Sequence, residues 1–295
     1  MEGTAGSGTV FSSLELSELN GEPFDHVMRL VASGDHDGAT ARFGAIVRAH
    51  QRSVDGFRVW LTSIESFASD QLMPGRDSLV EDALSSSAAK HPELYGILDS
   101  ATVSWRHVLE YDSGAIDFIE RAKASITLLQ AEHELWVDAV TVALGMVMDQ
   151  AGISGLETCL RRTGDETLFR WMPTDVSRDL RTRAIVWTNL LRGNFASVTV
   201  SEEPGKVVIT QDPCGTCVRQ INDGLYSDGW LRLVEDRHPL TLNRGGEPIY
   251  RTHVALMHDI VPRERIGSSW PAFSCPLGLD PGPCQVTLLD RDSMT

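Results

Sequence analysis

Two stretches of this sequence, offset by 83 residues, carry the same helical pattern of apolar side chains. The first is RFGAIVRAHQRSVDGFRVWLTSI at 42–64, and the second is SITLLQAEHELWVDAVTVALGMV at 125–147. In both, the apolar positions recur at spacings of three and four, which place them on one face of an amphipathic helix. The aligned positions are Phe43, Ile46, His50, Val54, Phe57, Leu61 and Ile64 in the first stretch and Ile126, Leu129, His133, Val137, Val140, Leu144 and Val147 in the second. The sequence therefore predicts two helices that each bury an apolar face.

The correspondence continues beyond these helices. VEDAL at 80–84 resembles LETCL at 156–160, and TVSWRHVL at 102–109 resembles AIVWTNLL at 184–191. Turn-forming residues fall at matching breaks, GRDS at 75–78 and AGISG at 151–155. We interpret residues 36–111 and 119–193 as two repeats of a three-helix unit. Because one unit could not cover its own apolar stripe, we expect a duplicated helical bundle over residues 36–193.

Each predicted repeat carries a histidine on its buried face, His50 in the first and His133 in the second. If the two imidazoles meet near the pseudo-twofold axis, they form a site for a metal or a polar ligand. The alternative is a pair of core histidines, each hydrogen-bonded to a neighbouring polar group. Asp55 follows His50 by five residues, about 140° around a helix, so it cannot complete a chelate from the same face.

The composition is that of a globular protein, with 42% hydrophobic and 23% charged residues and a net charge of −15. This charge argues against nucleic acid or an anionic membrane surface as partners, because both attract clustered Lys and Arg. No uninterrupted apolar run reaches the roughly 18 residues of a membrane span. The opening stretch, MEGTAGSGTVFSSLELSELNGEP, lacks the features of a signal peptide. We expect a loose acidic tail over residues 1–35 and a cytoplasmic protein, and a homodimer is compatible with the sequence.

The pattern changes after residue 193. Residues 195–211 alternate apolar and polar around EEPGK, which predicts a β-hairpin of strands 195–201 and 206–211. Residues 229–236 and 284–290 are further predicted strands, and EPIYRTHVALMHDIVP predicts a strand that leads into a short helix. The predicted fold class is therefore α+β, a duplicated helical bundle followed by a small antiparallel β-rich Cys/His domain over residues 194–295.

Four of the five cysteines lie in this β-rich region. Cys214 and Cys217 form a CxxC pair in TQDPCGTC, and such a turn lets two thiolates bind one ion at about 2.3 Å. Four-coordinate zinc needs two more ligands, and by residue type the candidates are His253 with Cys275 or Cys284. The spacing differs from that of a zinc ribbon, because no second close cysteine pair follows.

Other interpretations of these cysteines remain open. In one, Cys214 is a nucleophile, His253 is its base, and backbone N–H groups beside Gly215 bind an oxyanion. A dithiol redox pair is less favoured, because the CxxC follows a hairpin strand without a thioredoxin-like βαβ pattern. Alternatively, the cysteines only fill a small core.

Three more residues are candidates for ligand contact. Arg219 could hold an anionic group of a ligand or belong to a surface ion pair. Tyr250 and Trp270 could line an apolar pocket, although both residue types also pack in protein cores.

At DPCGTC, HPLTL and EPIYRTH, about the last 100 residues resemble a set of uncharacterised bacterial proteins. In that set, a helical N-terminal region precedes a small domain with a DPCG turn, a histidine in a tyrosine-led segment and a late cysteine. The resemblance points to Cys214, His253 and Cys284 and implies no particular reaction. This chain departs from the family pattern beside the histidine, where Arg251 and Val254 stand in place of cysteines.

Together these patterns predict a cytoplasmic enzyme that acts on a small organic molecule in a pocket between the two domains. A zinc or thiolate centre in the C-terminal domain would carry a hydrolase or lyase reaction. The alternative is a non-catalytic ligand-binding or interaction scaffold with a structural zinc site.

Overall fold

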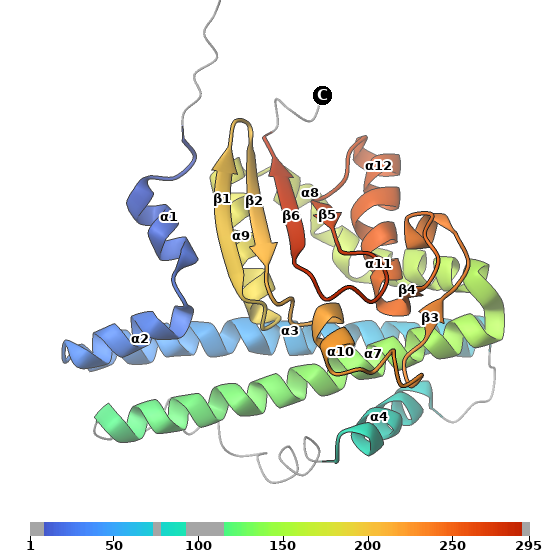
Figure 1. Ribbon diagram of the computed structural model, residues 1–295, viewed down its shortest axis with the longest axis horizontal. Coiled ribbons are helices and arrows are strands. Elements are labelled where there is room, and N and C mark those ends of the chain that lie inside the picture. The colour runs from blue at the N-terminus through green and yellow to red at the C-terminus, as the bar shows by residue number, and fades with distance from the viewer. Residues whose placement is uncertain (1–8, 73–77, 93–114, 291–295) are drawn as a thin grey trace, which may run out of the picture.

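The computed structural model describes residues 9–72, 78–92 and 115–290 (Figure 1). Helices dominate the first two thirds of the chain, and a four-stranded antiparallel sheet lies in the C-terminal region. The predicted α+β class is confirmed.

The two longest helices are α3 (His36–Gln71) and α7 (Ala115–Glu166), which run side by side in Figure 1. The predicted apolar stripes form their contact, because Val54, Leu61, Val137 and Leu144 are all fully buried. A shorter helix, α4 (Leu79–Lys90), packs on α7. The predicted duplication stays a prediction, since residues 93–111 of the first repeat lie outside the described residues.

Helix α7 bends at Gly152, whose φ of 64° falls in the left-handed region that glycine adopts without strain. Its portion Phe118–Glu166 is long and apolar enough to cross a membrane by length and composition, and 44% of an apolar 18-residue stretch within it is buried inside the molecule. A core helix of a globular protein meets the same criterion, so this is a weak indication.

Residues 9–35 are not the loose tail that the composition predicted. They form α1 (Ser13–Asn20) and α2 (Pro23–Ala32), and Phe11 and Val27 are buried in the core. Helix α1 begins with a capping box, in which Ser12 and Glu15 exchange hydrogen bonds. The short polar helix is anchored to the sheet because Asn20 bonds both the N–H and the carbonyl of Val200.

The chain then forms the 3₁₀ turn η1 (Leu168–Arg170), α8 (Met172–Val176) and α9 (Leu180–Gly193). Asp179 caps α9 by accepting a 2.7 Å hydrogen bond from the Thr182 N–H. Trp187 and Leu191 of α9 pack against the apolar face of the sheet.

The sheet has the strand order β1-β2-β6-β5, with every neighbouring pair antiparallel. Its strands are β1 (Val198–Glu203), β2 (Lys206–Gln211), β5 (Ala272–Ser274) and β6 (Cys284–Leu289). The hairpin and the last strand were predicted, whereas β5 was not. The predicted strand 229–236 shrinks to β3 (Leu233–Val234), which pairs with β4 (Glu247–Pro248) in a separate two-stranded sheet.

Short helical segments connect these strands. They are α10 (Cys217–Asn222), η2 (Pro239–Thr241), η3 (Ile249–Arg251), α11 (Thr252–Val254), the π-helical segment η4 (Ala255–Ile260) and α12 (Val261–Ile266). Residues from α7, the CxxC turn and η4 share one apolar core, so the helical and β-rich parts of the chain pack together directly.

Candidate metal centre

The antiparallel pairing of β2 and β6 brings distant cysteines together. Gln211, the last residue of β2, lies opposite Cys284, the first residue of β6. The CxxC turn leaves the sheet at this same end of the two strands, and Cys217 then begins α10. Cys284 and the turn therefore meet although some 70 residues separate them in sequence.

The turn is held in place by its contact with the end of α9. An added Cβ on Gly215 would lie 1.9 Å from the carbonyl oxygen of Asn194. Only glycine permits this close approach of two backbones.

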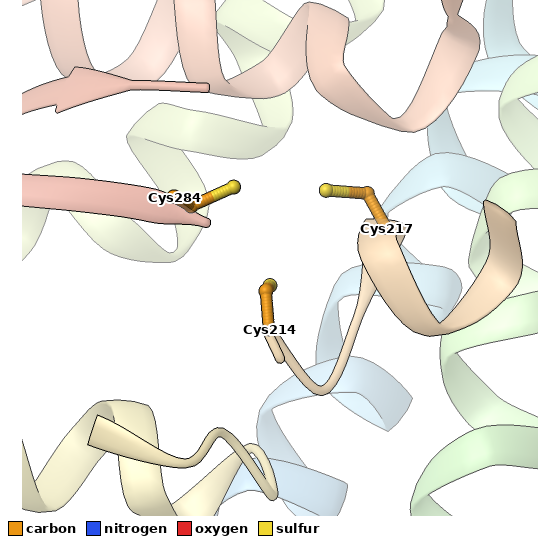
Figure 2. A group of neighbouring side chains, drawn as sticks. All are labelled: Cys214, Cys217 and Cys284. Atoms are coloured by element: carbon orange, nitrogen blue, oxygen red, sulfur yellow. The ribbon is translucent and has the colours of Figure 1, made fainter. Parts of the chain in front are cut away.

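The sulfur atoms of Cys214, Cys217 and Cys284 all lie within 4.8 Å of one another, and all three residues are buried. Figure 2 shows their side chains converging from the turn, from α10 and from the start of β6. Three thiolates bound to one zinc ion at about 2.3 Å each would have similar separations. The residues present therefore fit a single thiophilic metal ion.

Cys275 lies beside this group. It follows β5, is half-buried, and its thiol is within hydrogen-bonding reach of Cys284. The fifth cysteine, Cys159, is buried in α7, and burial raises the pKa of its thiol to about 12. Such a desolvated thiol is unreactive at neutral pH.

Hydrogen bonds within the cluster separate the acidities of its thiols. Bonds from Cys217 and Cys284 lower the pKa of Cys214 well below its ordinary value, and the Thr216 hydroxyl lies 3.2 Å from the Cys214 sulfur. The same contacts with Cys214 raise the pKa of Cys217 and of Cys284. The thiols therefore titrate together, and the hydrogen bonds within the group favour the thiolate form of Cys214.

Arg251 supplies positive charge to the cluster. Burial opposes its charged form, but the Coulombic attraction of Cys217 raises the pKa of its guanidinium above the ordinary value. Its Nη1 donates to the carbonyls of Pro276 (2.8 Å) and Gly278 (2.7 Å). A hydrogen bond with Cys217 adds to this rise in the pKa of Arg251, and its Nη1 also pairs with the buried Glu247 Oε2 at 3.3 Å.

The three clustered cysteines and the neighbouring Cys275 all line a cavity of about 590 Å³. Aromatic side chains form much of its wall, including Trp60, Trp187, Tyr250 and Phe273. Among the described lining residues, Asp55 is the one carboxylate, and no Lys or Arg is present. The cavity is therefore suited to a largely apolar molecule.

Two histidines, His253 and His258, also line this cavity. His253 lies in α11 and His258 in the π-helical segment η4 that follows it, and their ring centroids are 6.4 Å apart. In a continuous α-helix, five residues would be about 140° apart around the axis, and the wider π-helical turn reduces this angle. Each Nδ1 bonds a backbone carbonyl, of Tyr250 for His253 and of Trp270 for His258. Because a carbonyl only accepts, each Nδ1 carries the proton and each Nε2 has a free lone pair.

Burial lowers the pKa of His253 to about 4 and that of His258 to about 3. Both imidazoles are therefore neutral near pH 7. His253 is not one of the three residues whose ligand atoms lie within 4.8 Å of one another. It is a neighbour of the candidate centre and an available proton acceptor.

Arg219 does not face this cavity. Its guanidinium forms a buried ion pair with Asp138 of α7, which is fully buried, and a second pair with Asp223 at 3.1 Å. Gln220 completes the network with a 2.7 Å bond to Asp138. The guanidinium of Arg219 is thus held in ion pairs within the fold. The predicted contact of Arg219 with a ligand in this cavity is wrong for this structure.

Trp270 is likewise a core residue. It is fully buried and donates its indole N–H to Asp175 Oδ2 at 2.7 Å. It packs against His258 and Trp187, which line the cavity, but is not itself part of the lining. Of the predicted ligand contacts near the cysteines, only Tyr250 reaches the cavity.

His50 and His133 both contact Phe195, His50 by stacking at 3.9 Å and His133 at 5.2 Å between ring centroids. His50 Nδ1 bonds the Gly193 carbonyl at 3.0 Å, and His133 Nε2 bonds the Asn194 side chain at 3.2 Å. These contacts match the core-histidine alternative, in which each ring bonds a neighbouring polar group.

Sequence reasoning missed several lining residues, among them Trp60, Trp187 and Phe273, and it named His258 only as a possible ligand by residue type. The aromatic residues lie on α3, α9 and β5, and no sequence pattern predicts that these three elements meet. His258 follows His253 by five residues, which matches neither the α-helical nor the β-strand period. Only the π-helical turn joins them.

Comparisons with models of known protein families, with curated proteins and with solved structures found no match. The resemblance carried by DPCGTC stays an expectation, and the functional argument rests on the geometry of the site.

Proposed function

We propose that this protein binds a zinc ion through Cys214, Cys217 and Cys284 and acts on a small, largely apolar organic molecule in the adjoining cavity. The observation that carries the proposal is that three buried thiols, mutually within 4.8 Å, line a cavity of about 590 Å³. Thiolate donors select zinc and other soft ions over magnesium or calcium. Catalytic zinc sites commonly use three protein ligands and leave a fourth position open.

The residues of the cavity have separate roles in this proposal. The aromatic wall, which includes Trp60 and Phe273, holds the substrate and excludes water. His253 is neutral with a free Nε2 and accepts a proton. A zinc ion with an open position supplies an activated water for hydrolysis when it is bound.

A second function is a structural zinc site in a non-catalytic binding protein. Its supporting observation is that Cys275 lies beside Cys284 and lines the same cavity, so a shift of its side chain toward the three clustered sulfurs would supply a fourth thiolate. The two functions differ in the part played by Cys275. In the catalytic proposal it only lines the cavity, whereas in the structural alternative it is a ligand.

Metal analysis of the purified protein, by mass spectrometry of acid-digested samples, tests the centre. We expect stoichiometric zinc in the wild type, loss of zinc in C284S, and retention in C159S, the matched control at a buried cysteine outside the cluster. C275S separates the two functions, because it keeps zinc if the fourth position is open and loses it if the site is closed. Metal-free wild type, or iron in place of zinc, would overturn the proposal.

Hydrolysis of a chromogenic aryl ester, 4-nitrophenyl acetate, tests catalysis. We expect zinc-dependent hydrolysis that falls by about 10²-fold in H253A, as for loss of a general base. Circular dichroism and zinc content should be unchanged in that variant. A wild type with full zinc and no hydrolysis above buffer would favour the structural alternative.

A further inference from the structure

A second cavity, of about 600 Å³, shares no lining residue with the first. It is lined by the start of α2, by α3 between residues 42 and 52, by the facing part of α7, and by the junction of α9 with β1. The proposed metal centre makes no use of it.

The charge of this cavity is opposite to that of the chain. Its charged lining residues are Arg42, Arg52, Lys123, Arg192 and Glu22. Four cations and one carboxylate give +3, in a protein whose net charge is −15. A cleft that gathers one sign of charge concentrates ligands of the opposite sign.

Two of these four cations have hydrogen-bond or ion-pair partners among the described residues, and the other two have none. Arg192 donates through Nη2 to the carbonyls of Leu19 and Gly21, and Lys123 lies 3.8 Å from Glu120. Arg42 and Arg52, in contrast, make no ion pair or hydrogen bond with any other residue of the described ranges. They lie ten residues apart on α3, about 15 Å along the helix axis, and both border the cavity.

Much of the remaining lining is apolar, beside the polar residues His50, Thr127, Asn189 and Ser197. Phe24, Ile46, Ile126 and Phe195 provide most of this surface. Phe195 has a φ of 58°, which is unfavourable for a residue with a side chain, and its ring is stacked on His50. His50 is neutral at pH 7, because burial lowers its pKa. An apolar wall thus faces a group of unpaired guanidinium side chains.

From this combination we infer that the second cavity binds an amphipathic organic carboxylate, with its apolar body against Phe24 and Phe195 and its carboxylate held by one of the two arginines that border the cavity, Arg42 or Arg52. Guanidinium groups bind carboxylates through two parallel hydrogen bonds. The first cavity lacks any such cation, so the two cavities take ligands of different charge.

Isothermal titration with decanoate tests this inference, with 1-decanol as the uncharged probe of equal length. We expect R42Q/R52Q to weaken decanoate binding by about tenfold, which corresponds to about 1.4 kcal/mol. The matched control is R48Q, because Arg48 is an exposed arginine on the same helix outside both cavities. Decanoate affinity should also fall as ionic strength rises from about 0.01 M to about 1 M.

Three outcomes would overturn the inference: no decanoate binding, equal affinity in wild type and R42Q/R52Q, or equal affinity for decanoate and 1-decanol. Since the first cavity has no Lys or Arg in its lining, binding there would not respond to these substitutions. The zinc proposal is independent of this result, because none of the substituted residues lies near the cysteines.

Discussion

At the scale of single residues, the network around Asp138 shows how the chain uses a buried charge. Asp138 is fully buried, yet its pKa is lowered, because the charge of Arg219 and the hydrogen bonds around it outweigh desolvation. Gln220 bridges Asp138 and Thr141 and accepts a bond from Tyr226. The network ties α10, which begins at Cys217 of the CxxC pair, to the long helix α7.

Removing one partner of this pair leaves an uncompensated buried charge. We expect R219M to lower the free energy of unfolding by about 3 kcal/mol. The control is R161M, because Arg161 pairs with Glu264 on the surface and should contribute less than about 1 kcal/mol. Urea denaturation of both variants makes the comparison, and an equal effect would contradict a structural role for Arg219.

A second residue-scale prediction concerns pH. Burial lowers the pKa of His133 in the folded protein to about 4, from an ordinary value of 6.5. The unfolded chain therefore binds more protons between these values, so stability is present above pH 6.5 and is lost as the pH falls toward 4. From pH 7 to pH 4.5 His133 should contribute a loss of roughly 2–3 kcal/mol.

The measurement compares unfolding at these two pH values in wild type and in H133Q. The variant has no titrating ring at this position, so its stability should depend less steeply on pH. An unchanged pH dependence would show that His133 is not buried in the neutral form.

At the scale of elements, the CxxC turn depends on its contact with the end of α9. G215A would force the Asn194 carbonyl or the turn to move, and we expect weaker zinc binding together with a lower melting temperature. The control is G56A, where an added Cβ meets nothing within 4 Å and should stabilise α3 by roughly 0.5–1 kcal/mol. Calorimetry and zinc titration are the readouts, and normal zinc affinity in G215A would contradict this dependence.

The same scale explains which elements sequence reasoning could predict. The apolar stripes of α3 and α7 repeat with the helical period of 3.6 residues, and the hairpin β1–β2 alternates with the strand period of 2. Both patterns are local, so the sequence could predict these elements. Helices α1 and α2 were both missed. Helix α1 is short and polar, and it is stabilised by long-range contacts such as that of Asn20 with Val200. The π-helical turn of η4 has no local signature, so the approach of His258 to His253 could not be foreseen.

At the scale of the whole molecule, the candidate centre forms where the helical and β-rich parts pack together. Residue type and the resemblance both indicated Cys284 as a candidate, but its position depends on the pairing of β6 with β2, which local sequence does not specify. Arg219 was misassigned for a related reason, because its partner Asp138 lies 81 residues away on α7. The sequence thus predicted the ligand types, whereas long-range packing decided which residues meet.

X-ray absorption at the zinc edge of the purified protein tests the central claim most directly. The account predicts zinc with three sulfur neighbours at about 2.3 Å and one lighter oxygen or nitrogen neighbour. Absence of zinc, or zinc surrounded by oxygen and nitrogen alone, would contradict it.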